Sequence, residues 1–337
     1  MKIGFSRKLL LLLLLAVVAA CFGLSGCDNA TFSERSFFAM DTIMDVKIDG
    51  GEDLFPAVGN LISLWDAKLS ATNSRSLVCA LNNGETVRDP ETAELFRRIG
   101  EICLSTDGAF DPTVRPLICA WGFFDKNYRV PSQTEIEEIL PKVGYEKIIV
   151  ENGEVTFSQG VSVDLGAVGK GFLSDVLKAY LTENGVKNAL LNLGGNVTAL
   201  GKKNGSDWKV AIKDPVGDGY VGVMTLSDRS AVTSGLYERY FEQNGKKYGH
   251  ILDPKTGYPV ENDLLSVTVV GEDATLCDAL STALFVMGLS DAVAYVRENS
   301  IDALFITNDG VYLTETVDKH ITLSGGYAAR KKTVISW

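Results

Sequence analysis

The stretch "DALFITNDGVYLT", residues 302–314, decides the fold class because a very short turn joins its two strand-like halves. Asn308, Asp309 and Gly310 form that turn, and residues of this kind between apolar runs are typical of a β-hairpin. The sequence "KIIVENGEVTF", residues 147–157, has the same form around an Asn-Gly pair. Hairpins join neighbouring antiparallel strands, so the two stretches favour an α+β fold over a doubly wound parallel sheet.

Helices and further strands lie between these hairpins. Apolar residues recur at helical spacing over residues 54–70, which predicts an amphipathic helix. Similar patterns predict helices over residues 91–103, 169–183 and 273–287. Strand-like runs occupy residues 42–48, 188–201, 208–214, 221–227 and 264–270. No low-complexity segment and no shift in composition follows Met40, so residues 39–337 are predicted to form a single compact unit.

The N-terminus has the pattern of a lipoprotein signal peptide. A positively charged start precedes an apolar run over residues 9–20, and the tetrapeptide Leu24-Ser25-Gly26-Cys27 reads as a lipobox. Cleavage would remove residues 1–26, make Cys27 the lipidated N-terminus and leave residues 27–38 as a polar tether. The alternatives are cleavage at Cys21 or an uncleaved anchor, although the run is shorter than the ~20 residues of a spanning helix.

Each of these readings places the rest of the chain outside the cytoplasm and attached to a membrane. The expected location is the periplasmic face of an inner membrane or the outer face of a single membrane. The chain is acidic, with a formal charge of −11, which disfavours binding to nucleic acid or to anionic lipid through charge alone. The lipid on Cys27 would therefore hold the protein at the membrane.

The remaining cysteines give no sign of a metal site. None of them forms a CxxC pair, which disfavours zinc binding. They are Cys79, Cys103, Cys119 and Cys277. An extracytoplasmic location permits disulfides, but the spacing of these four predicts no pairing.

Glycines at the start of a predicted helix suit the binding of a phosphate. In "VDLGAVGKGFLSD", residues 163–175, Gly166, Gly169 and Gly171 surround Lys170. Glycine lets backbone N–H groups approach a phosphate, and a helix N-terminus favours negative charge. The Gly-x4-Gly-Lys-Ser/Thr spacing of a P-loop is absent, and an ordinary strand-to-helix turn would have a similar sequence.

Two further segments combine polar groups with apolar surroundings. Gly194 and Gly195 interrupt a strand-like run, which favours a β-bulge over a close approach to a ligand. In "DGAFDPTVRPL" and the "WGF" that follows it, Asp111, Arg115 and Trp121 would suit an aromatic ligand pocket or a loop packed on the core.

The segment "EDATLCDALSTALFVMG", residues 272–288, places a carboxylate and a hydroxyl inside an apolar helix. Asp278 and Thr282 are four residues apart and share one helix face. A lone buried charge is costly, so this pair needs a partner, and one hard cation such as Mg²⁺ satisfies both oxygens. A capping or surface pair is the alternative.

His250 is one of only two histidines and lies in "KKYGHILDPKTGYP", residues 246–259. A strand-like run leads into it, and an Asp-Pro-Lys-Thr-Gly turn follows it. This context alone suits the end of a hairpin as well as a catalytic base. The other histidine, His320, is expected on the surface or in a strand.

Together these segments resemble the ApbE family of FAD:protein FMN transferases, from Met40 almost to the C-terminus. Eight motifs occur in the family's order: "MDTIMDV", "LSATNSRSLVCALN", "GAFDPTV", "VDLGAVGKG", "LNLGGNV", "VTSGLY", "YGHILDPKTG" and "CDALSTALFVMG". The resemblance implies ApbE-like (T-fold-like) mixed sheets with flanking helices in a single catalytic unit.

The resemblance also implies a reaction, with FAD as the substrate and Mg²⁺ as the cofactor. FAD would be split at its pyrophosphate, FMN joined through a phosphoester bond to a threonine or serine of an acceptor flavoprotein, and AMP released. The implied acceptors are flavin-bearing subunits of NADH:quinone reductase, of Rnf-type complexes or of related extracytoplasmic flavoproteins. The alternatives are a pyrophosphatase that yields FMN and AMP, and a lipoprotein that binds FAD without transfer.

The family's site residues map onto this sequence motif by motif. The implied metal ligands are Asp278, Thr282, the carbonyl of Gly169 and Thr275. The implied FAD site is lined by Met40, Thr72, Ala109, Phe110, Asp111, Gly166, Lys170, Phe172, His250 and Ile251. His250 would stand at the pyrophosphate as the catalytic residue, with Asp253 as its candidate partner.

Two positions depart from the family pattern. Many members have a tyrosine near the flavin where this chain has Thr72, and many have glycine where it has Asp41. These departures put the stacking and the affinity of the flavin in question, whereas the metal and phosphate motifs are complete.

Overall fold

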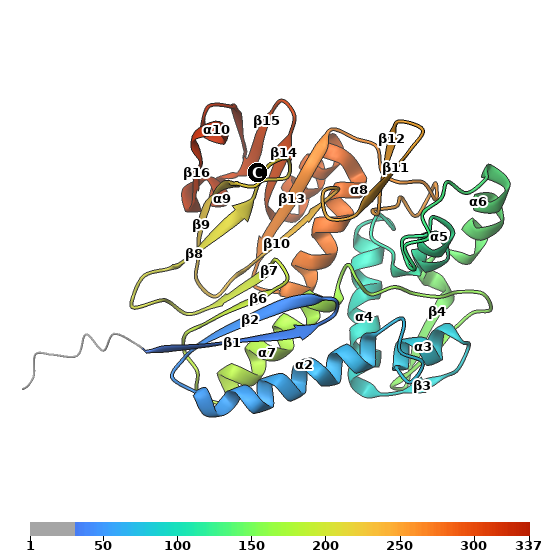
Figure 1. Ribbon diagram of the computed structural model, residues 1–337, viewed down its shortest axis with the longest axis horizontal. Helices are drawn as coiled ribbons and strands as arrows, with labels where there is room; N and C mark the ends of the chain where they lie inside the picture. Colours follow the sequence, from blue (N-terminus) through green and yellow to red (C-terminus); the bar gives the residue numbers. More distant parts are fainter. Residues whose placement is uncertain (1–30) are drawn as a thin grey trace, which may run out of the picture. The chain divides into compact units, whose positions relative to one another are not determined.

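A nine-stranded sheet organises residues 31–337, the part of the chain that the computed structural model describes (Figure 1). Its strand order is β1-β2-β6-β7-β10-β13-β14-β15-β17. These strands are β1 (Phe32–Ala39), β2 (Thr42–Asp49), β6 (Ala189–Leu193), β7 (Asn196–Leu200), β10 (Ser230–Gly235), β13 (Leu264–Gly271), β14 (Asp302–Thr307), β15 (Gly310–Thr314) and β17 (Lys331–Ile335). All neighbours are antiparallel except β15 and β17, which confirms the predicted α+β class.

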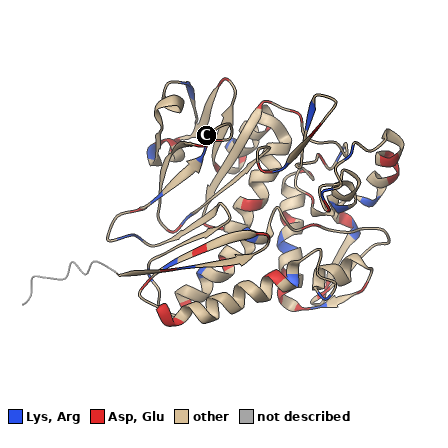
Figure 2. Ribbon diagram, in the orientation of Figure 1, with Lys and Arg blue, Asp and Glu red and all other residues tan. Residues whose placement is uncertain are grey.

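Three smaller sheets accompany the large one. One contains β8 (Trp208–Lys213), β9 (Tyr220–Leu226) and β16 (Ile321–Leu323), and another contains β3 (Val87–Arg88), β4 (Ile148–Glu151) and β5 (Glu154–Phe157). The third is the hairpin of β11 (Tyr240–Gln243) and β12 (Lys246–Gly249). In the ribbon view acidic and basic residues are interspersed along these elements (Figure 2).

The predicted hairpins form, and their turns explain why. β14 pairs with β15, and β4 pairs with β5. In the second hairpin Asn152 and Gly153 have φ values of 52° and 77°, and two positive φ angles are what a two-residue type I′ turn requires.

Gly194 and Gly195 correct one expectation. They do not form a β-bulge but the two-residue turn between β6 and β7, with φ values of 62° and 96°. A Cβ at Gly194 would lie 2.5 Å from the side chain of Thr42, so no larger residue fits there. Apolar runs flank the two glycines on both sides, so the sequence alone does not distinguish a turn between two strands from a bulge within one strand.

The four predicted helices are α2 (Phe55–Leu69), α4 (Pro90–Ser105), α7 (Gly169–Glu183) and α8 (Ala274–Asn299). Gly288 is not helical, with φ 77° and ψ 166°, so α8 kinks one residue after its predicted end at Met287. The shorter helices are α3 (Leu77–Asn82), α5 (Arg115–Ala120), α6 (Gln133–Ile139), α9 (Glu315–His320) and α10 (Gly325–Ala328). The 3₁₀ helices are η1 (Glu52–Leu54), η2 (Pro112–Val114), η3 (Leu140–Lys142) and η4 (Tyr145–Lys147).

The large sheet separates two hydrophobic cores. Helices α2, α4, α7 and α8 cover one face, and β8, β9 and α9 cover the other. Successive side chains of β14 alternate between the cores: Phe305 packs with the helices, whereas Leu304 and Ile306 pack against the smaller sheet. Burial of each such side chain contributes about 1.5–3 kcal/mol.

Among the described residues, α8 is the one helix long and apolar enough to cross a membrane. Its contacts give it another role, because it packs against β10, β13 and α7. It is a core helix, and its first half carries Asp278 and Thr282.

Strand β1 corrects the predicted tether. Residues 32–38 were assigned to it, but they form an edge strand in register with β2, from Phe32 opposite Asp49 to Ala39 opposite Thr42. The segment reads as polar because an edge strand exposes hydrophilic groups, and Ser36 bonds to Asp45 at 2.6 Å. The predicted signal peptide and Cys27 lie outside the described residues.

Candidate active site

A cleft of about 610 Å³ opens beside the large sheet. Its walls come from the β1–β2 turn, the C-terminal end of α2, the loop before α7 and its N-terminus, and the first half of α8. The segments on both sides of η2 and those that follow β10 and β12 complete it. Most of the predicted site residues line it: Met40, Thr72, Ala109, Phe110, Asp111, Gly166, Gly169, Lys170, His250, Ile251, Asp278 and Thr282. Residues more than 200 positions apart in the sequence therefore meet in one cleft, as the motifs predicted.

His250 follows β12, and its imidazole is fixed by one backbone oxygen. Its N–H and its Nδ1 both lie 3.1 Å from the carbonyl oxygen of Arg239. A carbonyl oxygen can only accept a hydrogen bond, so Nδ1 carries the proton and Nε2 keeps its lone pair. The ring lines the cleft, and Nε2 is the atom left to accept a proton from a ligand.

The surroundings of His250 favour the neutral imidazole. Burial among protein groups lowers its pKa to about 4, the Arg239 carbonyl opposes this shift, and the positive charges of Arg239 and Lys170 add to it. The residue stays partly accessible because one side faces the cleft. At neutral pH the free protein therefore offers an unprotonated base.

This shift predicts a pH dependence of stability. Between pH 6.5 and about 4 the unfolded chain protonates His250 while the folded protein does not, so folding becomes less favourable as pH falls through this window. His250→Gln removes the titration and leaves all other groups in place. Urea unfolding of both proteins across the window should show a steeper loss for the wild type, and parallel curves would contradict the assignment.

Asp253 is not the partner of His250. Its carboxylate accepts hydrogen bonds from the N–H of Lys255 at 2.9 Å and from the hydroxyl of Thr256 at 3.0 Å. Because the side chain folds back into its own turn, it does not line the cleft. The sequence suggested Asp253 as the partner of the His250 imidazole, but in the structure this partner is the carbonyl oxygen of Arg239.

Asp278 and Thr282, both on α8, also line the cleft. One carboxylate oxygen of Asp278 accepts the N–H of Gly171 at 2.8 Å, which ties α8 to the first turn of α7. The hydroxyl of Thr282 lies 3.1 Å from that of Ser234 on β10. Among residues 31–337 no lysine or arginine forms an ion pair with Asp278.

This donor set fits a hard divalent cation. The described residues contain no group of three or more His, Cys, Asp or Glu side chains that could hold a metal. Asp278, Thr282 and the carbonyl of Gly169 instead offer one carboxylate, one hydroxyl and one backbone oxygen. Mg²⁺ takes few protein ligands of this kind and completes its shell with water and substrate phosphates.

Gly171 is required where α7 crosses α8. A Cβ at this position would lie 2.3 Å from the carbonyl oxygen of Ala274 and 2.7 Å from Cβ of Asp278. Gly171→Ala should push the helices apart, lower the free energy of unfolding by about 1–3 kcal/mol and displace the Asp278 carboxylate. Thermal or urea unfolding measures the loss. Gly219→Ala is the matched control, because nothing lies within 4 Å of its Cβ, and equal stability of the two variants would contradict the prediction.

Thr275 and Phe172 were predicted in the site, but the structure places both elsewhere. The hydroxyl and the N–H of Thr275 donate to the carboxylate of Asp175, at 2.5 and 2.9 Å, and the residue is fully buried. Phe172 packs edge-on against Trp65, with ring centroids 4.7 Å apart, in the hydrophobic core. The carboxylate of Asp175 binds the Thr275 hydroxyl, and the ring of Phe172 packs against Trp65. Neither Thr275 nor Phe172 lines the cleft.

Asp111 lines the cleft with both carboxylate oxygens already bonded. One accepts the N–H and the hydroxyl of Thr113, at 2.8 and 2.6 Å, and the other accepts the N–H of Tyr145 at 2.9 Å. Burial raises the pKa of this carboxyl. Asp111 thus holds the loop that presents Ala109 and Phe110 to the cleft.

Sequence reasoning assigned no role to the cleft residues in or near the "VTSGLY" motif, which are Thr233, Ser234, Gly235, Glu238 and Arg239. Burial raises the pKa of the Glu238 carboxyl. The negative charge of Asp278 raises this pKa further, and the positive charge of Lys170 lowers it. The Glu238 side chain nevertheless stays open to the cleft. Arg239 acts through its carbonyl oxygen, which no side-chain pattern can predict. The motif was recognised, but its residues were given no role.

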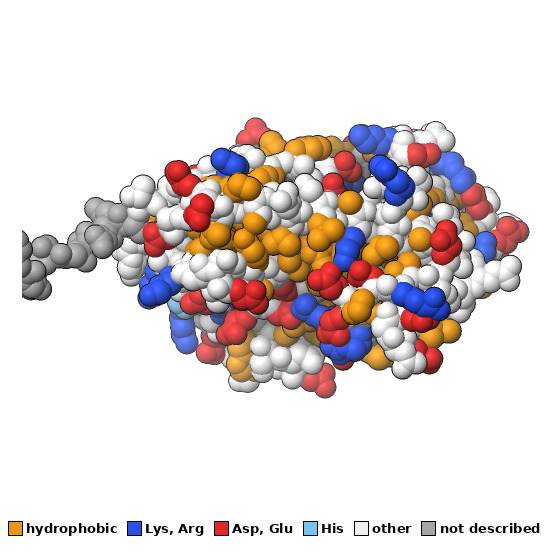
Figure 3. All heavy atoms as spheres, turned by 90° about the horizontal axis from the view of Figure 1, so that it is seen from below, with side chains coloured by type: hydrophobic (Ala, Val, Ile, Leu, Met, Phe, Trp, Pro, Cys, Tyr) orange, Lys and Arg blue, Asp and Glu red, His pale blue; other side chains and the backbone are white. Residues whose placement is uncertain are grey.

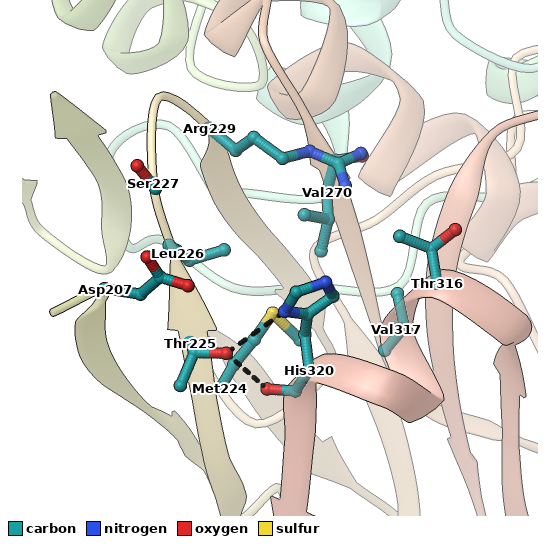
Figure 4. A pocket seen from close by; sticks show the side chains of 10 residues that line it. All are labelled: Asp207, Met224, Thr225, Leu226, Ser227, Arg229, Val270, Thr316, Val317 and His320. Carbon is teal, nitrogen blue, oxygen red and sulfur yellow. Dashed lines mark hydrogen bonds between the residues drawn. The ribbon is translucent and has the colours of Figure 1, made fainter. Parts of the chain in front are cut away.

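A second, smaller cavity of about 200 Å³ lies between β9 and α9 (Figure 4). His320, expected on the surface or in a strand, ends α9 there, and its Nδ1 lies 3.2 Å from the hydroxyl of Thr225. Arg229 in the same wall is already paired with Asp302 and with the carbonyl of Val270. None of the predicted site residues lines this cavity.

The fold matches that of flavin transferases of known structure. The flavinyl transferase ApbE of Pseudomonas stutzeri, in its apo form, superposes with a TM-score of 0.78 at 29% identity over 86% of this chain and 96% of that one. The ApbE protein of Thermotoga maritima gives a TM-score of 0.77 at 34% identity, over 88% of this chain and 98% of that one. The class of protein that fold and site define is therefore the flavin transferase.

The chain belongs to the ApbE family, which matches residues 40–305. A protein of Klebsiella pneumoniae (strain 342) named FAD:protein FMN transferase is 34% identical over 84% of this chain and 91% of its own length. Another of that name, from Treponema pallidum (strain Nichols), is 35% identical over 75% of this chain and 76% of its own length. The predicted family and enzyme class are confirmed.

Proposed function

We propose that this protein transfers FMN from FAD to a threonine or serine hydroxyl of an acceptor flavoprotein and releases AMP. The observation that carries the proposal is that one cleft is lined by both groups: a neutral imidazole with a free Nε2, and the oxygen pair of Asp278 and Thr282. The first suits removal of a proton, and the second suits a cation beside a pyrophosphate. The names of the relatives support the same activity.

The proposed reaction breaks the phosphoanhydride bond of the FAD pyrophosphate and forms a phosphoester bond to the acceptor. The acceptor oxygen bonds to the phosphorus of the FMN half, the bond from that phosphorus to the AMP oxygen breaks, and AMP leaves with the bonding electron pair. Nε2 of His250 takes the proton from the acceptor hydroxyl, while Nδ1 remains bonded to the Arg239 carbonyl. Lys170, at the N-terminus of α7, adds positive charge beside the phosphates.

Asp278, Thr282 and the Gly169 carbonyl are the groups that would hold Mg²⁺. When bound, this ion would offset charge on the pyrophosphate and on the departing AMP. The N–H of Gly171 fixes one oxygen of Asp278, so the carboxylate is oriented before any ligand arrives. Asp278 is 4% exposed, and this burial restricts the carboxylate to the direction that the helix pair allows.

The cellular setting completes the proposal. The lipobox at Cys27 supports a membrane-anchored lipoprotein on the extracytoplasmic side. Its acceptors would then be flavin-bearing subunits of NADH:quinone reductase, of Rnf-type complexes or of related extracytoplasmic flavoproteins.

One assay tests transfer against its alternatives. The mature protein is mixed with FAD and Mg²⁺, with and without an unflavinylated acceptor subunit, and AMP and covalent flavin are measured. Transfer predicts fluorescent flavin on the acceptor in a denaturing gel and AMP formed in step with it. AMP without acceptor would identify a pyrophosphatase, and neither product would identify a FAD-binding protein.

A further inference from the structure

Two large apolar side chains stand exposed at the tip of the β1–β2 hairpin. Phe38 is 75% exposed and Ile43 is 61% exposed. They are direct cross-strand partners, so they lie side by side on one face of the hairpin. Phenylalanine and isoleucine are usually buried, and neighbouring exposed apolar residues often mark an interaction site. We call these two residues the hairpin-tip pair.

The hairpin-tip pair continues the cleft onto the outer surface. Phe38 belongs to the cleft wall, whereas Ile43 lies outside it. Among residues 31–337, strand β1 is the edge of the sheet and pairs with β2 alone. Viewed from the side on which α2 and the hairpin lie, hydrophobic side chains gather near the middle of the surface, between charged ones (Figure 3).

The tip is held in place before anything binds. The N–H of Met40 donates to the carboxylate of Asp66 on α2 at 3.0 Å, and Met40 and Asp41 form a turn with φ values of 47° and 58°. Gly194 lies against the side chain of Thr42 on the other flank. A partner that docks here therefore loses little free energy to ordering of the tip.

A bound FAD molecule in the cleft could cover Phe38 but not Ile43. A macromolecule that must place a hydroxyl inside the cleft has to approach across its rim, and the rim carries this pair. We propose that Phe38 and Ile43 dock the acceptor protein by contacting an apolar side chain close to its flavinylated threonine or serine. The proposal rests on the proposed function and specifies its partner surface.

The test compares Phe38→Ala, Ile43→Ala and the double variant with the wild type. Val216→Ala is the matched control, because Val216 is 62% exposed in the β8–β9 loop and does not line the cleft. The probe is the purified, unflavinylated flavin-bearing subunit of an NADH:quinone reductase. Its binding to each variant is measured directly, together with its KM in transfer and the Kd of each variant for FAD.

Docking predicts that the double variant binds the subunit about tenfold or more weakly, with a matching rise in KM. Ile43→Ala alone should show part of this loss at an unchanged Kd for FAD, because Ile43 lies outside the cleft. Equal binding of the subunit by all variants would overturn the proposal. It would also be overturned if Phe38→Ala bound FAD more weakly while Ile43→Ala bound the subunit as tightly as the wild type. Tight binding to the wild type without covalent flavin would refute the proposed function and leave the docking result standing.

Discussion

Replacing His250 by alanine or glycine is expected to lower the rate of FMN transfer by about 100-fold or more, while FAD still binds. The expectation follows from one atom: Nε2 is the nitrogen of this cleft-lining residue that the Arg239 carbonyl leaves unprotonated and free to accept the acceptor proton. The variants lack this base. Transfer is measured by covalent flavin on the acceptor, and binding by quenching of flavin fluorescence.

The chain contains its own control for this experiment. His320 is the other histidine and lines the smaller cavity, so His320→Ala should transfer FMN at the wild-type rate. Thermal unfolding of both variants shows whether the fold is retained. Full transfer by a folded His250→Ala protein would remove His250 from the mechanism.

Replacing Asp278 by alanine is expected to remove both activity and the response to Mg²⁺. The carboxylate is the one charged member of the proposed ligand set, and its loss should lower transfer by about two orders of magnitude or more. Mg²⁺ should also stabilise the wild type against heat and leave Asp278→Ala unchanged, which is a readout independent of catalysis.

Asp291 provides the comparison for Asp278. It lies on the second half of α8, is exposed and does not line the cleft, so Asp291→Ala should keep both the activity and the Mg²⁺-induced rise in melting temperature. An Asp278→Ala protein that still requires Mg²⁺ and still uses it would place the metal elsewhere.

Much of the fold could be predicted because its signals are local. Helices α2, α4 and α7 follow from apolar spacing, and the β4–β5 hairpin follows from Asn152 and Gly153. Strand β1 could not be predicted in this way. Its middle residues, Ser33-Glu34-Arg35-Ser36, are polar and lie at a sheet edge, and only the pairing with β2 gives the segment its structure.

The site shows the same division between local and distant causes. His250, Asp278 and Gly169 could be located through short motifs, and the structure brings them to one cleft. Asp253 and Thr275 were misplaced because side-chain hydrogen bonds hold them in a turn and at a helix crossing. Such bonds depend on geometry that sequence spacing does not contain.

Mass spectrometry of an acceptor subunit after incubation with this protein, FAD and Mg²⁺ tests the central claim most directly. The account predicts that the acceptor gains the mass of one FMN less one water on a single threonine or serine, with one AMP released for each, and that His250→Ala yields neither. An acceptor of unchanged mass, with FAD consumed or intact, would contradict it.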